Sequence, residues 1–235
     1  MNILALDTSS RAASCAILRD EALAGELFVN IGLTHSQTAL PMVEKLLEQT
    51  ATALGDIDVF AVTTGPGSFT GLRIGISAIK GMAMAMDKPC AGVSTLAALA
   101  AGAGLFHEYI CSAMDARRGQ VYTAIFQNIA GGASRVRQDQ ALSIEALGEE
   151  LAELSSSVLL VGDGAALCFE ALEKPSYLSL APERFLHQRA SAVGALAQEV
   201  ARNGQLVSAG ELAPIYLRLP QAERERMEST QNSSL

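Results

Sequence analysis

Eleven consecutive residues, from Gly65 to Gly75, spell GPGSFTGLRIG. They follow the apolar run Val59–Val62 and lead into a long apolar segment that ends near Met86, which predicts a strand, a turn and a helix. A glycine-rich turn at this position can direct several backbone N–H groups at one anion, at the positive end of the helix. Phosphate binding is therefore the first chemistry to consider.

The sequence of this turn matches none of three known strand-to-helix motifs, of which two bind phosphate groups and one carries a catalytic nucleophile. A Walker A loop needs Lys and a hydroxyl after its last glycine, but Leu and Arg follow Gly71. A dinucleotide-binding loop needs G-x-G-x-x-G, and Thr70 breaks the pattern that Gly65 and Gly67 begin. Ser68 does not stand in G-x-S-x-G, so a nucleophile elbow fails as well. The alternative is a tight turn whose glycines let the helix pack on a sheet.

Three polar residues at the end of the first strand form a second candidate site. Asp7 can hold a metal ion through water, and the hydroxyls of Thr8 and Ser9 can hold a phosphate. The alternative is an ordinary strand-end turn with side-chain hydrogen bonds to the backbone. The candidate nucleotide-holding residues, as a remnant of a former site, are Asp7, Thr8, Ser9, Gly65, Gly67 and Gly71.

The remaining reactive residue types give weaker patterns. His35, His107 and His187 have no metal-ligand spacing among themselves or with the cysteines, and no Ser/His/Asp arrangement can be argued. His35 opens a helix, where a capping or interface residue is expected rather than a catalytic base. Asp115 ends a strand before Arg117-Arg118-Gly119, which indicates either a hairpin turn with a basic tip or a charged loop facing a cleft or a partner.

Amino-acid composition argues against several classes of function. The 235 residues are 49% hydrophobic with a net charge of −8, and strong direct binding of nucleic acid by an acidic chain with scattered arginines is not expected. The four cysteines lack C-x-x-C spacing and lie among apolar residues, which predicts buried free thiols in a reducing cytoplasm. No signal peptide and no membrane span are expected, so we expect a cytoplasmic location without a membrane partner.

The hydrophobic pattern predicts an α/β protein made of two similarly built halves. The first half is expected to contain strands 2–6, 14–18, 22–29, 57–63 and 89–93 and helices 34–53, 72–86 and 94–101. The second is expected to contain strands 109–114, 120–127, 134–138, 158–161 and 215–219 and helices 143–154, 165–172 and 191–202. Ser94 or Thr95 is the expected N-cap of the helix 94–101, and Ser143 begins an imperfect capping box.

The expected domains are residues 1–104 and 105–219, with a disordered tail at 220–235. Two helices of the first half, Thr34–Ala53 and Leu72–Met86, are strongly apolar, and the second is rich in methionine. Such helices usually belong to a core. They also suit an adaptable surface for a partner, so both interpretations stay open.

Together these motifs resemble the TsaB family, also called YeaZ. The resemblance extends to about Leu219 and depends on Leu6-Asp7-Thr8-Ser9, His35-Ser36 with Leu40-Pro41, the turn Gly65–Gly75, Asp115-Ala116-Arg117 with Gly119-Gln120-Val121-Tyr122, and Pro214–Arg218. It implies the actin/Hsp70/sugar-kinase (ASKHA) superfold, in which two RNase-H-like βββαβα domains enclose a cleft. That architecture agrees with the two predicted halves.

The resemblance also implies a function without catalysis. Family members pair with the catalytic paralogue TsaD, and with TsaE, in the transfer of threonylcarbamoyl to N6 of adenosine 37 of tRNAs that read codons beginning with A. Thr95 and Leu99 stand where TsaD has its two metal-binding histidines, and neither side chain replaces imidazole as a ligand. We therefore expect no tightly bound cofactor, with ATP and metal used by the partner, and contact with tRNA only through the complex.

In the family, helices of the N-terminal half pack against the equivalent helices of TsaD, and the same face can form a homodimer. The expected interface residues are His35, Leu40, Val43, Leu46, Leu47, Leu72, Ile76, Ile79, Met82 and Met86. Two alternatives are a weakly active ATP-binding ASKHA enzyme, which would use Asp7, Thr8 and Gly65–Gly71, and a metallopeptidase, for which no ligand set can be assembled.

Overall fold

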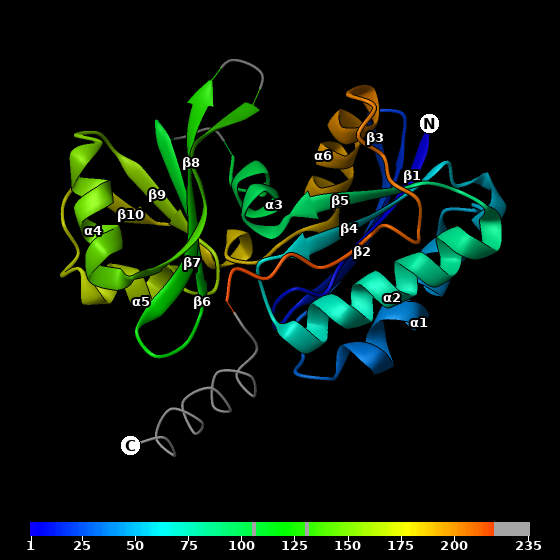
Figure 1. The fold of residues 1–235 in the computed structure, drawn as a ribbon, viewed down its shortest axis with the longest axis horizontal. Coiled ribbons are helices and arrows are strands. Elements are labelled where there is room, and N and C mark those ends of the chain that lie inside the picture. The colour runs from blue at the N-terminus through cyan, green and yellow to red at the C-terminus, as the bar shows by residue number, and fades with distance from the viewer. Residues whose placement is uncertain (105–106, 130–131, 219–235) are drawn as a thin grey trace, which may run out of the picture.

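The computed structural model describes residues 1–104, 107–129 and 132–218, which form two five-stranded mixed sheets that lie side by side (Figure 1). The expected disordered tail, 220–235, lies outside the described residues. The first sheet has the order β3-β2-β1-β4-β5. Its strands are β1 (Asn2–Asp7), β2 (Ala13–Arg19), β3 (Ala22–Val29), β4 (Val59–Gly65) and β5 (Cys90–Ser94), and the helices of this half are α1 (His35–Gln49), α2 (Phe69–Met86) and α3 (Thr95–Gly102).

The second sheet has the order β8-β7-β6-β9-β10, so it repeats the first sheet strand for strand. Its strands are β6 (Tyr109–Asp115), β7 (Gln120–Ile129), β8 (Gly132–Ser143), β9 (Val158–Val161) and β10 (Leu178–Leu180), and its helices are α4 (Ile144–Glu153), α5 (Ala165–Ala171) and α6 (Ala190–Arg202). Short 3-10 turns cover Leu54–Asp56 and Glu183–Phe185. The predicted pair of similar halves is confirmed, and β10, which the sequence pattern did not predict, completes the repeat.

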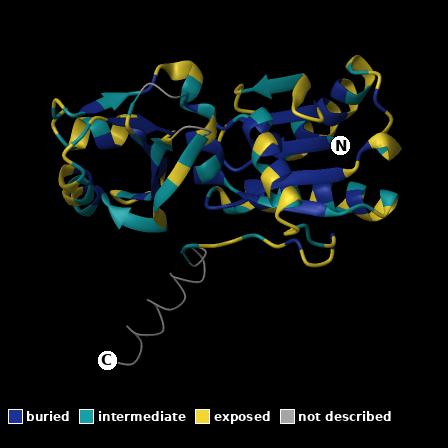
Figure 2. Cartoon of the chain, turned by 90° about the horizontal axis from the view of Figure 1, so that it is seen from above, coloured by how far each residue is buried: buried dark blue, intermediate teal, exposed yellow. Residues whose placement is uncertain are grey.

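Alternating residues of the central strands supply both faces of each sheet. In β1, Leu4 and Leu6 belong to the core under α1 and α2, whereas Ile3 and Ala5 belong to the core on the opposite face. A strand buried on both faces has to be apolar at nearly every position, which is the pattern of β1 and β4. Figure 2 shows this buried interior in both halves.

The last helix of each half covers the sheet of the other half. Helix α3 contacts β6, β7 and β8 of the second sheet, and α6 lies on β1 and β2 of the first sheet and also contacts α3 (Figure 1). Ala190, Val193 and Ala197 of α6 are fully buried there. The predicted helix 191–202 was expected to belong to the second half. Its amphipathic pattern shows that one side is buried but does not show which sheet buries it.

Three helices begin with a serine that caps the backbone. The Oγ atoms of Ser68, Ser94 and Ser143 accept the N–H of the residue three positions later, each at 3.2 Å, at the start of α2, α3 and α4. The predicted cap at Ser94 or Thr95 is therefore Ser94, and the predicted start at Ser143 is confirmed.

The chain after α6 runs back along α2 without forming a strand. We call residues 203–218 the C-terminal strap. Lys80 of α2 donates to the carbonyl oxygens of Gly210 and Leu212, and the N–H of Ile215 donates to the carbonyl of Thr64 at 2.8 Å. The expected strand over 215–219 is therefore wrong for the described residues 215–218, because this backbone makes one hydrogen bond to the end of β4, at Thr64, instead of a ladder.

Across the described ranges no helix is both long and apolar enough to span a membrane.

The cysteines provide a test of the packing. Cys15, Cys90, Cys111 and Cys168 are free thiols without exposed surface, and burial raises the pKa of the thiols of Cys15 and Cys111 to about 12. Since the thiolate is the reactive form, we expect native protein to react negligibly with a thiol-specific chromogenic disulfide near pH 8 and all four to react in denaturant. Rapid stoichiometric reaction of the native protein would contradict this packing.

Candidate partner face and interdomain cleft

The predicted glycine turn connects β4 to α2, and its glycines are required by a close approach to the end of β1. A Cβ atom on Gly71 would overlap the carbonyl oxygen of Thr8, and one on Gly75 would overlap the Thr8 hydroxyl. That hydroxyl donates to the carbonyl of Gly71 at 2.8 Å. Helix α2 therefore lies directly on the strand-end turn, with no room for a side chain between them.

The rest of the turn is also bound by the protein's own chain. The N–H of Ser68 donates to the carbonyl of Ser9 at 2.7 Å, and a Cβ on Gly67 would overlap that same carbonyl. A Cβ on Gly65 would likewise overlap the carbonyl oxygen of Ile215 in the strap. At Gly65, Gly67 and Gly71, the space that a phosphate loop would keep for its ligand is occupied by backbone carbonyl groups. The packing interpretation of the turn accounts for this geometry.

Asp7 is enclosed by hydroxyl groups. Thr63 donates to the Asp7 carboxylate at 2.7 Å, and Ser9 donates to it at 2.9 Å from its hydroxyl and at 3.2 Å from its N–H. Only 1% of Asp7 is exposed, and burial raises the pKa of its carboxyl above the ordinary value although these hydrogen bonds lower it. The strand-end alternative is therefore supported: these side chains hold the turn together.

A cleft of about 580 Å³ lies between the two halves. It is lined by three guanidinium groups, Arg11, Arg117 and Arg218, and by two carboxylates, Asp115 and Asp163. Of the six expected nucleotide-holding residues, the lining includes Ser9 and Gly67, whereas Asp7, Thr8, Gly65 and Gly71 lie behind the surface.

Asp115 fits both sequence interpretations. It ends β6 at a hairpin to β7, and its Oδ1 accepts the N–H of Arg117 at 2.7 Å within that turn. The same residue faces the cleft, where its own N–H donates to the Asp163 carboxylate. Burial raises the pKa of Asp163, so the floor of the cleft contains a carboxyl that loses its proton less readily than usual.

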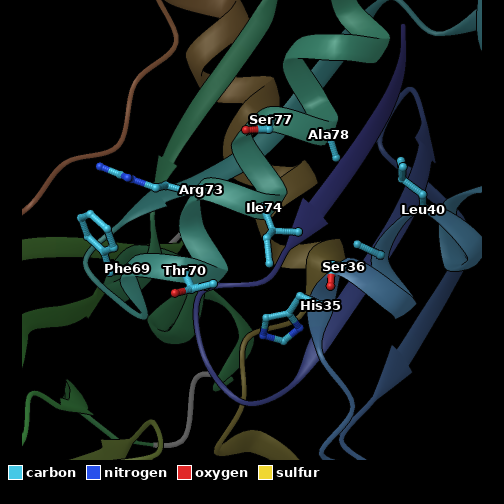
Figure 3. A pocket seen from close by; sticks show the side chains of 10 residues that line it. His35, Ser36, Leu40, Phe69, Thr70, Arg73, Ile74, Ser77 and Ala78 are labelled. Atoms are coloured by element: carbon cyan, nitrogen blue, oxygen red, sulfur yellow. The ribbon is translucent and has the colours of Figure 1, made fainter.

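A second hollow, of about 670 Å³, opens on the outer side of α1 and α2 (Figure 3). We call it the α1–α2 groove. Leu40 of α1 lies at one rim, and Phe69 and Arg73 of α2 lie at the other. The groove lining consists of His35, Ser36, Ala39, Leu40, Phe69, Thr70, Arg73, Ile74, Ser77 and Ala78.

His35 lies at the inner end of this groove. Its Nε2 is 2.7 Å from the carbonyl oxygen of Ser10, and it opens α1 as expected, although Thr34 is the N-cap position. Both roles considered for His35, near a cap and at an interface, remain consistent with this position.

Several expected interface side chains point inward. Val43, Leu46, Leu72, Ile76 and Ile79 are at most 4% exposed and form the core between the helices and the first sheet. Leu47, Met82 and Met86 are partly buried against the same core. These five buried residues cannot meet a partner directly, because helical spacing turns them toward the sheet. Leu40, at 53% exposed, is the one apolar member of the set that is mostly open to solvent.

One cluster at the rim of the groove was not predicted from the sequence. Phe69 and Tyr216 stack with ring centroids 4.9 Å apart, and the Arg73 guanidinium lies 3.9 Å from the Phe69 centroid. Arg73 also donates from Nε to the Tyr216 hydroxyl at 3.0 Å. Phe69 lines both the groove and the cleft. Tyr216 is far away in sequence, so spacing gave no signal, although all three residues lie in motifs quoted for the family resemblance.

Comparison with known proteins assigns the family. The family model described as TsaD, tRNA N6-adenosine threonylcarbamoyltransferase, matches residues 32–225. The tRNA threonylcarbamoyladenosine biosynthesis protein TsaB of Bacillus subtilis is 34% identical over 97% of this chain and 99% of its own length. The chain belongs to the TsaB family.

Relatives named as the transferase match a smaller part. The tRNA N6-adenosine threonylcarbamoyltransferase of Gluconobacter oxydans is 36% identical over 41% of this chain and 30% of its own length. The structure of YeaZ from Pseudomonas aeruginosa superimposes with a TM-score of 0.78 at 30% identity, over 92% of this chain and 99% of that one. The end-to-end match is thus with TsaB proteins.

The expected superfold is confirmed as well. A ROK hexokinase from Thermus thermophilus matches with a TM-score of 0.50 at 12% identity, over 87% of this chain and 100% of that one. At such low identity the match concerns the fold alone. This TsaB-family chain therefore has the ASKHA arrangement of two RNase-H-like halves.

The two positions that the resemblance aligns with metal-binding histidines, Thr95 and Leu99, lie one turn apart in α3. Leu99 is 1% exposed and packs in the core of the second sheet, and Thr95 is fully buried with a hydroxyl that has no hydrogen-bond partner among the described residues. In the parts of the chain that the structure describes, no three His, Cys, Asp or Glu side chains group as a metal site.

Two glycines of α2 provide a matched test of the packed turn. Gly71→Ala should lower the free energy of unfolding by about 1–3 kcal/mol, because the added methyl group meets the Thr8 backbone. Gly81→Ala, in the same helix but with nothing within 4 Å, should raise it by up to about 1 kcal/mol. Urea unfolding measures both, and equal effects would show that the turn is not tightly packed.

The buried Asp7 gives a pH test. A carboxyl whose pKa is raised by folding contributes stability below its unfolded pKa, about 3.9, and this contribution is lost as pH rises through the folded pKa. We expect the free energy of unfolding of Asp7→Asn to equal or exceed that of wild type near neutral pH. At about pH 4 the wild-type carboxyl is protonated, so the variant should no longer be the more stable of the two. Urea unfolding at both pH values measures the difference. A variant much less stable at neutral pH would show that the hydrogen bonds of the carboxylate outweigh its burial.

Proposed function

We propose that this chain is a non-catalytic accessory subunit in the synthesis of threonylcarbamoyladenosine on tRNA. It would pair with a TsaD-type transferase and work with a TsaE-type ATPase. The supporting observation is the match with TsaB over 97% of this chain and 99% of the relative, which the transferase relatives do not equal. The proposal includes a cytoplasmic location. It also includes a homodimer formed through helices α1 and α2, the same surface that would bind the transferase.

Two features of the site support a role without catalysis. The glycine turn and Asp7 are bound to the protein's own backbone and hydroxyl groups, which leaves few groups for a nucleotide. Leu99, at a position where the resemblance expects a metal ligand, is a buried core side chain. We therefore assign ATP and metal to the partner subunit.

The α1–α2 groove supports pairing with a partner. It presents Leu40 and Ile74 beside small side chains on two helices whose other faces are fixed against the first sheet. The chain's net charge of −8 also suits a subunit that leaves contact with tRNA to its partners.

Reconstitution tests the proposal. Purified chain, TsaD-type partner and TsaE-type ATPase from one organism are incubated with tRNA, ATP, threonylcarbamoyl adenylate and Mg²⁺, and the modified nucleoside is quantified after digestion. We expect modification only when chain and transferase are both present. Modification by this chain alone, or micromolar Mg-ATP binding with turnover in calorimetry, would favour the enzyme alternative.

A substitution in the groove tests the interface. Leu40→Asp places a carboxylate on an exposed apolar position of α1, so we expect folding to be retained and the Kd for the transferase to rise about tenfold or more. Leu167→Asp, at a leucine of α5 that is 44% exposed, is the matched control and should bind like wild type. Calorimetry measures both. Normal binding by Leu40→Asp would exclude this face.

A further inference from the structure

Arg73 is a fixed cation at the rim of the α1–α2 groove. Its Nε is held by the Tyr216 hydroxyl, and its guanidinium plane rests over the Phe69 ring. Both η nitrogens are left without an acceptor among the described residues, and none of the ion pairs found there involves Arg73. The donor fork is therefore oriented before any partner arrives.

Besides Arg73, the groove lining contains one other basic residue, His35. The lining combines apolar and small side chains with a few hydroxyls and contains no acidic residue (Figure 3). An occupant that matched this surface would be apolar, with one negative charge placed at the rim. A carboxylate meets the planar fork with two parallel hydrogen bonds, and less side-chain freedom is lost because the fork is already held.

We propose that the α1–α2 groove binds an apolar helix of the transferase partner that carries an aspartate or glutamate opposite Arg73. This inference rests on the proposed function. The carboxylate accepts hydrogen bonds from the η nitrogens of Arg73, while Leu40 and Ile74 cover the apolar part of the helix. Tyr216 acts as a positioning residue for Arg73, so the C-terminal strap takes part in partner recognition through that hydroxyl.

Calorimetric titration of the transferase into variants of the full chain tests this ion pair. Arg73→Gln should raise the Kd about tenfold and weaken its dependence on NaCl between about 50 and about 500 mM. Arg73→Lys should fall between Arg73→Gln and wild type, because it keeps the charge but not the fork. Tyr216→Phe, which keeps the ring stack and loses only the hydroxyl, should raise the Kd by a smaller factor.

Arg184→Gln is the matched control. Arg184 is also exposed, also lies over a phenyl ring, that of Phe185 at 4.7 Å, and is outside the groove. It should leave both the Kd and the salt dependence unchanged. Urea unfolding of each variant separates a loss of binding from a loss of fold.

If Arg73→Gln does not fold stably, exchanging the two charges of the ion pair provides a second test. Arg73→Glu should bind wild-type transferase poorly and regain affinity when one exposed acid of the partner's helix pair is changed to arginine. Failure of every such swap would overturn the ion pair, as would an unchanged Kd for Arg73→Gln or an effect on self-association alone. If wild-type chain and transferase do not associate at all, the proposed function itself fails, which is a different result from a failure at Arg73.

Discussion

Helix α2 and the end of β1 meet backbone to backbone, because Gly71 and Gly75 leave no side chain between the helix and Thr8. This contact fixes the rotation of α2 about its axis. Residues in register with the two glycines face the sheet, so Arg73, Ile74 and Ser77 have to face away from it. The groove and the stacked cluster at its rim thus follow from a contact on the opposite side of the helix.

The same contact leaves the cleft between the halves open while the glycine turn is bound to the protein's own chain. Backbone groups that would face a ligand are hydrogen-bonded to Ser9, and the strap closes against Gly65. Each bond that stabilises the turn removes a group from ligand binding. The cleft retains three arginines but little of the predicted nucleotide set.

Local features were predictable from the sequence, and distant ones were not. Most strands, the α-helices α1 to α6 and the caps at Ser94 and Ser143 follow from periodicity and from hydrogen bonds within three residues. Apolar residues such as Val43 and Leu46 suit a core and an interface equally, so their type and spacing could not decide between the two. The position of α6 and the pairing of Tyr216 with Arg73 depend on contacts across more than 100 residues, to which no local pattern corresponds.

The exchange of terminal helices also sets the order in which the chain can become stable during synthesis. The first sheet is complete at Ser94, yet one of its apolar faces is covered by Ala190, Val193 and Ala197. Until the ribosome has released that helix, the first half exposes apolar surface of the kind that chaperones bind. A nascent chain of this protein therefore has to wait for its last helix, and a fragment ending at the apparent boundary between the halves would lack part of its core.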